Sequence, residues 1–328
     1  MSCYSLPFRF IVIKNIKNIK AFPLNSTIQS ITNRTKIITQ AQYLQMAPLV
    51  WFITGASTGL GAAITEHALK RGDHVVTTAR DVSKVQHFVD TYGSDKALAL
   101  RLDVTNYDEA QSTIKSAFDK FGHIDLLINN AGYAEFTTVE DASMENFRAQ
   151  IETNFMGVVN VTKAALPHLR RQKSGHIFQV SSIGGRVGTP GFSAYQPAKW
   201  AVGGFSTILA QEVAPFGIKV TVLEPGIMPT QWAATAMKKK APPMSEPYIK
   251  HITPIWELFQ GFATKSKIGA DLDGIAKIII KVYESETPPV KLLVGGDAYE
   301  YAQKTMQALK ETDEKWRDVS LSADKVWE

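Results

Sequence analysis

The sequence predicts an α/β fold in which about seven mainly parallel strands form one doubly wound sheet within a single domain. Two observations lead to this prediction. From Leu49 onward, short apolar runs alternate with segments of helical periodicity. A glycine-rich turn also follows the first apolar run. The chain has 328 residues, of which 45% are hydrophobic and 20% charged, so it can bury a sizeable core and has the composition of a soluble globular protein.

The first elements are defined by clear sequence boundaries. Residues 49–54 are an apolar run that stops at a glycine, and we expect a strand there. A helix is expected over about 59–71, because Ile64, Ala68 and Leu69 fall on one side of it. Residues 74–79 are rich in β-branched side chains and predict the second strand.

The same alternation continues along the chain. We expect helices over about 82–91, 107–121, 144–171, 194–214 and 271–284, and strands over 97–102, 124–129, 176–180, 218–223 and 290–294. Residues 227–267 interrupt the pattern with several prolines and a run of lysines, and we interpret them as an insertion or lid within a catalytic domain of residues 46–297. Residues 298–328 are expected to form a helical tail without an assigned role.

Residues 1–45 differ from the rest of the chain. They hold six basic residues and no acidic one, so a net charge of +5 for the chain leaves −1 for the remainder. A basic groove on the folded domain is therefore not supported, and we expect no nucleic-acid partner. The segment is interpreted as a mitochondrial transit peptide, a disordered tail or an extension before a start at Met46. We expect a cytoplasmic protein, or a mitochondrial one if the segment is a transit peptide.

Cysteine and histidine usage gives no sign of a metal site. Cys3 is the only cysteine, which excludes a disulfide framework and a thiolate site. The seven histidines form no pair at metal-ligand spacing, so no metal is expected. No run approaches the ~18 apolar residues that a membrane-spanning helix needs, so we expect no transmembrane segment.

The turn after the first strand has the properties of a dinucleotide site. A helix that begins after a parallel strand points unpaired N–H groups and a positive dipole end at the crevice, where they can bind phosphate. The glycines allow a tight turn and a close approach to a pyrophosphate, as in Rossmann-like folds, although here three residues separate the first two glycines instead of one. The residues expected to bind the cofactor in this turn are Gly55, Ser57, Thr58, Gly59, Leu60 and Gly61.

The end of the second strand indicates which cofactor is bound. An acidic residue there would accept hydrogen bonds from the ribose 2′-hydroxyl of NAD, whereas an arginine favours the 2′-phosphate of NADP. The chain has Arg80 at this position and Asp81 next to it. We therefore expect NADP(H) to be preferred over NAD(H), and Asp81 keeps NAD(H) open as an alternative.

Four motifs in order give the chain a family resemblance. Thr54-Gly55-x-x-x-Gly59-x-Gly61, Asn129-Asn130-Ala131-Gly132 and Tyr195-x-x-x-Lys199, with Ser182 thirteen residues before the tyrosine, resemble the short-chain dehydrogenase/reductase family over about residues 49–294. The resemblance implies that Asp103 contacts the adenine side of the cofactor and that Asn130, Ala131 and Gly132 support it. It further implies that Pro225, Gly226 and Thr230 close over the nicotinamide carboxamide.

The resemblance also implies the catalytic residues. Tyr195 would be the general acid or base, and Lys199, on the same face of a helix, would help to hold the phenol and the cofactor ribose. Lowering a phenol pKa from about 10 to about 7 requires about 4 kcal/mol, which Lys199 is placed to supply in part. Ser182 would bind the substrate oxygen, and Asn154 would hold a water in a proton relay.

Two local alternatives to these catalytic residues were weighed. Ser181 adjoins Ser182, but neighbouring side chains of extended backbone point in opposite directions, and Ser182 has the family spacing to the tyrosine. Tyr92, which is followed by Lys96, repeats the tyrosine–lysine spacing without a partner serine.

The substrate side of the predicted site is apolar. A lipophilic ketone or alcohol, such as a steroid, retinoid, polyketide or terpenoid, would fit its expected walls, although the same residues could serve as core or subunit contacts. The expected wall residues are Tyr133, Phe136, Val187, Pro190, Phe192, Met228, Trp232, Trp256, Phe259 and Phe262. The resemblance implies a homodimer or homotetramer formed through the helices near 144–171 and 194–214.

Two other functions are compatible with a nucleotide-binding fold. One is a non-catalytic module that binds NADPH as a sensor or partner, which would be marked by loss of the serine, tyrosine or lysine, and all three are present. The other is an NAD(P)-dependent epimerase or dehydratase, which would have a different glycine spacing and a larger C-terminal domain. The sequence favours an enzyme that interconverts a carbonyl and an alcohol.

Overall fold

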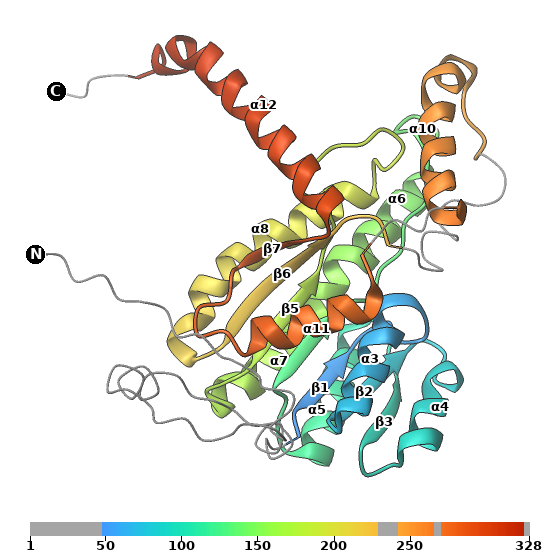
Figure 1. The fold of residues 1–328 in the computed structure, drawn as a ribbon, viewed down its shortest axis with the longest axis vertical. Helices are drawn as coiled ribbons and strands as arrows, with labels where there is room; N and C mark the ends of the chain where they lie inside the picture. Colours follow the sequence, from blue (N-terminus) through green and yellow to red (C-terminus); the bar gives the residue numbers. More distant parts are fainter. Residues whose placement is uncertain (1–47, 229–241, 266–269, 325–328) are drawn as a thin grey trace, which may run out of the picture. The chain divides into compact units, whose positions relative to one another are not determined.

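The computed structural model describes residues 48–228, 242–265 and 270–324. Seven strands make one sheet in which all pairs are parallel, in the order β3-β2-β1-β4-β5-β6-β7 (Figure 1). The strands are β1 (Val50–Ile53), β2 (His74–Ala79), β3 (Ala97–Arg101), β4 (Leu126–Asn129), β5 (His176–Val180), β6 (Lys219–Pro225) and β7 (Lys291–Val294). The predicted doubly wound parallel sheet is confirmed.

Helices cover both faces of this sheet. The helices of the sheet layers are α3 (Gly59–Arg71), α4 (Ser83–Tyr92), α5 (Tyr107–Phe121), α6 (Met144–Ile151), α7 (Gly157–Gln172), α8 (Tyr195–Val213) and α11 (Leu272–Tyr283). One core cluster joins α3, α4 and α11 to the sheet, and a second joins α5, α7 and α8 to its other face. The five inner strands, β2, β1, β4, β5 and β6, are therefore buried on both sides, which explains why their sequences are apolar runs, whereas the edge strands β3 and β7 are partly exposed.

The order of the strands determines where a ligand can bind. The chain passes from β1 outward to β3 and then returns to the other side of β1 to add β4. At such a reversal, the helices that follow β1 and β4 lie on opposite faces and leave a crevice at the carboxyl ends of the strands. The glycine turn after β1 and the motif Asn130-Ala131-Gly132 after β4 thus meet at this crevice.

Two segments differ from the sequence prediction. The helical region expected over 144–171 is interrupted by a π-helical segment, η1 (Glu152–Met156). The predicted lid contains a long helix, α10 (Glu246–Lys265), whose buried residues Ile252 and Trp256 are four residues apart, as expected for one helix face. The tail is helical, as expected, and forms α12 (Gly296–Leu321), which begins directly after β7.

Two short 3-10 helices complete the described elements. The segment η2 (Ile183–Gly185) follows β5, and η3 (Ala214–Phe216) follows α8. Ser182 immediately precedes η2 and its hydroxyl accepts a hydrogen bond from Gly184 N at 3.0 Å, so the start of η2 is fixed by this side chain.

Candidate active site

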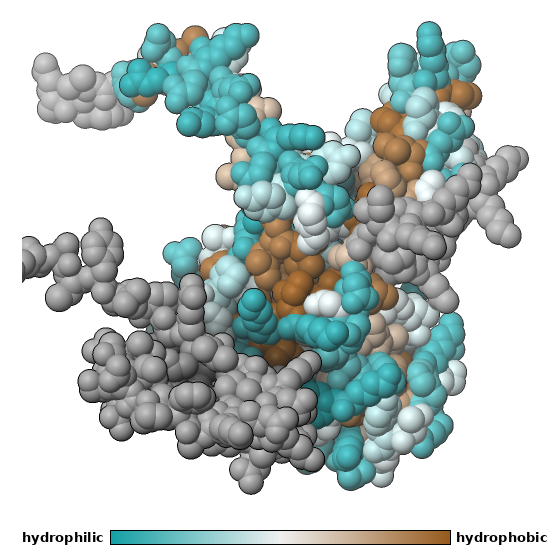
Figure 2. Space-filling model, viewed as in Figure 1, coloured by the Kyte–Doolittle hydropathy of each residue, from teal (hydrophilic) through white to brown (hydrophobic). Residues whose placement is uncertain are grey.

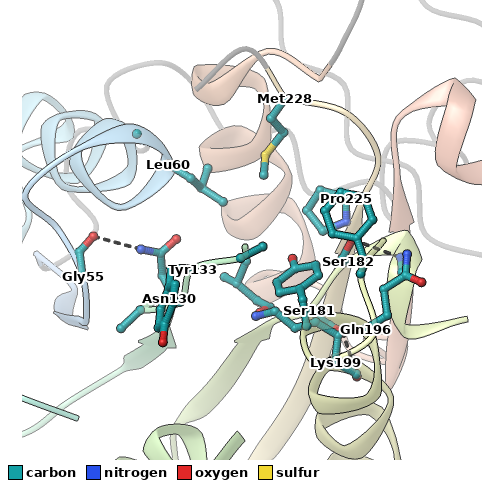
Figure 3. A pocket seen from close by; sticks show the side chains of 18 of the residues that line it. Gly55, Leu60, Asn130, Tyr133, Ser181, Ser182, Gln196, Lys199, Pro225 and Met228 are labelled. Carbon is teal, nitrogen blue, oxygen red and sulfur yellow. Dashed lines mark hydrogen bonds between the residues drawn. The ribbon is translucent and has the colours of Figure 1, made fainter. Parts of the chain in front are cut away.

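The turn after β1 is fixed by Asn130 on the neighbouring strand end. The Asn130 side chain donates to the carbonyls of Thr54 and Gly55 at 2.9 and 3.1 Å (Figure 3). The Thr54 hydroxyl accepts from the N–H groups of Asn130 and Ala131 at 2.9 and 3.0 Å. Gly55 has a φ of +65°, and a Cβ there would lie 2.8 Å from Ala131 Cα. Only glycine fits this position, because the two strand ends touch through backbone atoms.

The amino end of α3 faces the crevice without a side chain that satisfies its N–H groups. Thr58 is the N-cap residue but makes no side-chain cap hydrogen bond, and the first turn contains no acidic residue. A Cβ on Gly61 would lie 2.5 Å from both Asn130 Nδ2 and Gly55 O, so the helix packs closely against the turn. The unpaired N–H groups and the helix dipole fit a pyrophosphate at this point.

A cavity of about 870 Å³ runs along the carboxyl edge of the sheet. Most of the sequence-predicted site residues line it: Gly55, Ser57, Thr58, Gly59, Leu60, Arg80, Asp103, Asn130, Ala131, Gly132, Ser182, Tyr195, Lys199, Pro225 and Gly226. Gly61 lies behind the turn, and Asn154 lies behind Gly132, so neither is part of the described wall. Thr230 lies outside the described residues. The fold therefore brings together residues that are up to 171 positions apart, between Gly55 and Gly226.

Two cations lie at the end of β2. Arg80 and Lys84 are both exposed and both line the cavity. Asp81 instead accepts hydrogen bonds from Ser83 N and Ser83 Oγ at 3.1 and 2.6 Å, and the Ser83 hydroxyl holds the pKa of this carboxyl below its usual value. The carboxylate of Asp81 is thus engaged at the start of α4. Sequence reasoning missed Lys84, because Arg80 precedes α4 whereas Lys84 lies within it, so the two residues share no helix face.

Tyr195 and Lys199 lie at the other end of the cavity, on the first turns of α8. Tyr195 is the first residue of this helix, and Pro197 falls within its first turn, where it removes no intrahelical hydrogen bond. The Lys199 ammonium lies 5.6 Å from the centroid of the Tyr195 ring and donates to Val180 O at 2.9 Å. Both side chains are buried, at 7% and 4% exposure.

The two adjacent serines point in different directions. The Ser182 hydroxyl hydrogen-bonds the Tyr195 phenol. The Ser181 hydroxyl is buried and donates to the Lys199 backbone carbonyl at 3.1 Å, so it joins β5 to α8 (Figure 3). The geometry therefore puts the oxygen of Ser182, and not that of Ser181, next to the phenol.

Burial dominates the ionisation of the tyrosine–lysine pair. It raises the pKa of Tyr195 above its usual value, an effect that the hydrogen bond from Ser182 partly offsets. Burial lowers the pKa of Lys199 to about 8. Desolvation penalises phenolate and ammonium alike, and here it outweighs their attraction. The pKa of Tyr195 in this environment therefore lies above its ordinary value, opposite in direction to the lowering expected from the sequence.

Asn154 lies in the π-helical segment η1 and is fully buried. Its amide donates to Tyr133 O and Gln150 O, both at 2.8 Å, and its Oδ1 accepts from Tyr133 N at 3.1 Å. A Cβ on Gly132 would lie 2.6 Å from Asn154 Oδ1 and 3.4 Å from Lys199 Nζ. These two polar atoms thus approach the same point beside Gly132. Single-turn π-helical interruptions are frequent at functional sites.

Aromatic and aliphatic residues of α10 form one wall of the cavity near Tyr195. Phe192 and Phe259 pack edge to face with their ring centroids 5.2 Å apart. Figure 2 shows apolar residues along the side of α10 that is turned toward the base of α12. Of the predicted wall residues, Tyr133, Val187, Phe192, Met228, Phe259 and Phe262 line the cavity. Phe136 and Trp256 belong to the buried cluster around Phe192, Pro190 is not on the wall, and Trp232 lies outside the described residues.

Among the further cavity residues that sequence reasoning missed are Gln196, Asp297 and Tyr301. Gln196 fixes the loop before α8, since its amide accepts from Thr189 N at 2.6 Å and donates to Thr189 Oγ1 at 3.1 Å. Asp297 and Tyr301, on the first turns of α12, also line the cavity. The four-residue spacing of Asp297 and Tyr301 was visible in the sequence, but the position of α12 at the cavity was not.

Over the described ranges, no group of acidic, cysteine or histidine side chains could hold a metal ion. The same ranges contain no helix with the length and hydropathy needed to cross a membrane.

Comparison with known proteins identifies relatives of the whole domain. Oxidoreductase BOA17 of Botryotinia fuckeliana is 51% identical over 277 residues, which cover 84% of this chain and 98% of that protein. The 3-ketodihydrosphingosine reductase of Bacteroides thetaiotaomicron is 32% identical over 250 residues, or 76% of this chain and 89% of that protein. The crystal structure of a short-chain dehydrogenase from Streptomyces avermitilis is 33% identical and superposes with a TM-score of 0.76, covering 85% of this chain and 100% of that one.

Solved structures of the same fold contain either nicotinamide cofactor. A 3-ketoacyl-(acyl-carrier-protein) reductase from Brucella melitensis was solved with NADH (25% identity, TM-score 0.63, 76% of this chain and 98% of that one). An alcohol dehydrogenase from Thermococcus sibiricus, similar in fold alone, was solved with 5-hydroxy-NADP (24% identity, TM-score 0.61, 75% and 96%). The family model described as short chain dehydrogenase matches residues 49–241. With this match and these relatives, the chain belongs to the short-chain dehydrogenase/reductase family of oxidoreductases.

Proposed function

We propose that this protein is an NADP(H)-dependent oxidoreductase that interconverts a carbonyl and an alcohol on a lipophilic small molecule. The observation that carries the proposal is the arrangement of one cavity. At one end are the free amino end of α3 and two cations, and at the other are Ser182, Tyr195 and Lys199. A dinucleotide fits this end of the cavity for two reasons. Gly55 and Gly61 approach other backbone atoms closely, and the N–H groups at the start of α3 are not capped by a side chain.

The residues around Tyr195 can manage the proton that accompanies hydride transfer. When bound, the nicotinamide would supply or accept the hydride. In the reductive direction the neutral Tyr195 phenol donates its proton to the substrate oxygen, and the Ser182 hydroxyl, which contacts the phenol, hydrogen-bonds that oxygen as negative charge develops. In the oxidative direction Tyr195 accepts the proton.

Lys199 and Asn154 support this proton transfer. The Lys199 ammonium is held beside the tyrosine ring by Val180 O, so its charge favours the phenolate left after proton donation. Asn154 Oδ1 and Lys199 Nζ approach the same point beside Gly132, and in our proposal one water bridges them. Such a water would return a proton from solvent to the pair.

The preference for NADP(H) is supported by the charges at the end of β2. Arg80 and Lys84 present two cations to the cavity, whereas Asp81 is not among the residues that line it, and its Oδ1 accepts both hydrogen bonds from Ser83. A ribose 2′-phosphate would gain two charge-assisted hydrogen bonds there. A 2′-hydroxyl would not meet the carboxylate of Asp81 on the cavity wall.

The substrate class follows from the opposite end of the cavity. Its walls are apolar side chains such as Phe192, Phe259 and Phe262, and three acidic residues, Asp103, Glu135 and Asp297, line the cavity as a whole. Within the described part of the chain, Lys199 is the cation at this end, and it is buried and bonded to Val180 O. This environment favours an uncharged, lipophilic ketone or alcohol. The Bacteroides relative, which is named for a keto substrate, agrees with this class.

The tyrosine that repeats the motif spacing provides a matched control for this function. We expect Tyr195→Phe to lower NADPH-dependent reduction of lipophilic ketones by at least about a hundredfold, since it removes the proton donor. Tyr92→Phe should leave the rate unchanged, because Tyr92 bonds Glu66 and is not part of the cavity wall. Turnover of a panel of lipophilic ketones and alcohols, with NADPH and NADH, measures both. Equal rates for the two variants would contradict the proposed role of Tyr195.

We also propose a homodimer or homotetramer. On α8, Trp200 and Ile208 are 49% and 60% exposed and lie on one face, as apolar residues at a subunit contact would. Sedimentation velocity tests this, and a monomer at micromolar concentration would contradict it. The cytoplasmic location, with a mitochondrial one if residues 1–45 are a transit peptide, stays a prediction.

A further inference from the structure

The backbone that follows β6 is held by three segments from the C-terminal part of the chain. Gly226 N donates to Val294 O in β7 at 3.0 Å. Ile227 N donates to Asp297 Oδ2 in α12 at 2.7 Å. Ile227 O accepts from Ala270 N, before α11, at 3.0 Å. The N–H and the C=O of Ile227 are therefore both hydrogen-bonded. Among the described residues, Asp297 is the only one that bonds this backbone through its side chain.

Asp297 is turned toward this loop. It lies in the first turn of α12, whose N-cap residue is Gly295 and receives no side-chain cap. A Cβ on Gly226 would lie 2.2 Å from both carboxylate oxygens of Asp297, so the glycine leaves the space that the carboxylate occupies. The dipole of α12 stabilises a negative charge at this position. The carboxylate thus binds the loop after β6. An Asp side chain near the start of a helix more often bonds the N–H groups of that helix.

The same face of α12 forms part of the cavity. Asp297 and Tyr301 are four residues apart and both line it, next to Pro225, Gly226, Ile227 and Met228. Pro225 and Gly226 belong to the segment that the family resemblance implies closes over the nicotinamide carboxamide, and Ile227 and Met228 continue it. Beyond Ala302 the side chains of α12 are mostly exposed, so the contribution of the helix to the site is confined to its first two turns.

We propose that Asp297 is a positioning residue, which holds the segment Pro225–Met228 in the conformation that binds the nicotinamide end of the cofactor. The first turns of α12 then belong to the active site, and the helix is more than a C-terminal appendage. This inference rests on the proposed function, since it assumes that the cavity binds a nicotinamide dinucleotide. Asp297 acts on the cofactor through the loop, by holding the Ile227 N–H.

A series of substitutions at Asp297 tests this role. Asp297→Ala removes the acceptor of Ile227 N–H and should weaken NADPH binding about tenfold, the effect of losing one hydrogen bond to a charged group. Asp297→Asn retains an oxygen that can accept the same bond, so it should bind NADPH within about twofold of the wild type. Asp313→Ala, an exposed position on the same helix, is the matched control and should change nothing.

Two measurements distinguish a loss of loop positioning from a loss of folding and from a failure of the proposed function. The dissociation constant of NADPH, measured by its fluorescence on binding, is compared with the melting temperature of each variant. If Asp297→Ala does not fold, Asp297→Ser, which is too short to reach Ile227 N, replaces it with the same expected loss. A wild-type affinity in the variant that lacks the acceptor would overturn the inference, as would an equal loss for Asp297→Asn. If the wild type binds neither NADPH nor NADH, the proposed function fails instead.

Discussion

At the scale of single residues, the candidate site depends on which polar atoms are already engaged. Asp81 accepts two hydrogen bonds from Ser83 through Oδ1 and is not among the residues that line the cavity, whereas its neighbour Arg80 lines it. Ser181 and Ser182 both line the cavity. The Ser181 hydroxyl is bonded to the backbone of α8, whereas the Ser182 hydroxyl is bonded to the Tyr195 phenol. The residue types alone do not decide between Arg80 and Asp81 for the cofactor, or between Ser181 and Ser182 for the substrate. The hydrogen-bond partners of these residues distinguish them.

The cofactor preference can be tested at Arg80 and Lys84. We expect Arg80→Ala and Lys84→Ala each to weaken NADPH binding about tenfold, because each removes a charge-assisted hydrogen bond to the 2′-phosphate. NADH binding should stay within about twofold, since NADH lacks this phosphate. Titration of each variant with both cofactors provides the measurement, and Lys96→Ala, exposed and away from the cavity, is the control. Parallel losses for NADPH and NADH would refute a role in reading the 2′-phosphate.

At the scale of elements, the strands and the helices of the sheet layers were predictable, because their burial leaves apolar runs and apolar helix faces in the sequence. The meeting of Gly55, Asn130 and Tyr195 at one edge was predictable as well, since parallel strands bring their carboxyl ends together. The π-helical turn at Asn154 was not, because it depends on the contact with Tyr133 in a distant loop. The helix α10 has a helical spacing of Ile252, Trp256 and Phe259, but the prolines and the run of lysines that precede it led to the prediction of a lid over the whole of 227–267.

The pairing of β5 with β6 contains a buried histidine that makes the fold sensitive to acid. His176 is 1% exposed, and its Nε2 lies 2.9 Å from Thr221 Oγ1. Because the Thr221 hydroxyl donates its proton to Pro289 O, Nε2 must carry the imidazole proton. Nδ1 then has no partner within the described residues, and protonating it would bury an uncompensated charge. Burial accordingly lowers the pKa of His176 to about 3.

This histidine should make the free energy of unfolding depend on pH. Between about pH 3 and the unfolded value of 6.5, the unfolded chain binds the proton more strongly than the folded chain. Stability from this group is therefore complete above pH 6.5 and falls as the pH drops, by up to about 1.4 kcal/mol per pH unit. Urea unfolding of the wild type and of His176→Phe between pH 4 and pH 7 measures the difference. Parallel stability curves for the two proteins would show that His176 does not titrate in this way.

At the scale of the whole molecule, the cavity has opposite electrostatic ends. Arg80 and Lys84 lie at the end that suits the phosphate-bearing half of a dinucleotide, whereas Glu135 and Asp297 lie near the apolar wall. The net charge of the chain could not reveal this arrangement, because its excess of positive charge is confined to residues 1–45. The contribution of α12 was equally hidden, since only the tertiary structure places Asp297 beside Gly226.

The central claim is that the protein transfers a hydride between a nicotinamide and a carbonyl carbon, with Tyr195 moving the proton. The most direct measurement uses NADPH deuterated at C4 and a lipophilic ketone that the protein turns over, with mass spectrometry of the alcohol product. We predict one deuterium on the carbinol carbon from one of the two C4-deuterated epimers, and loss of this transfer in Tyr195→Phe with NADPH binding retained. Binding of NADPH without deuterium transfer to any member of a broad ketone panel would contradict the account and favour a non-catalytic NADPH-binding module.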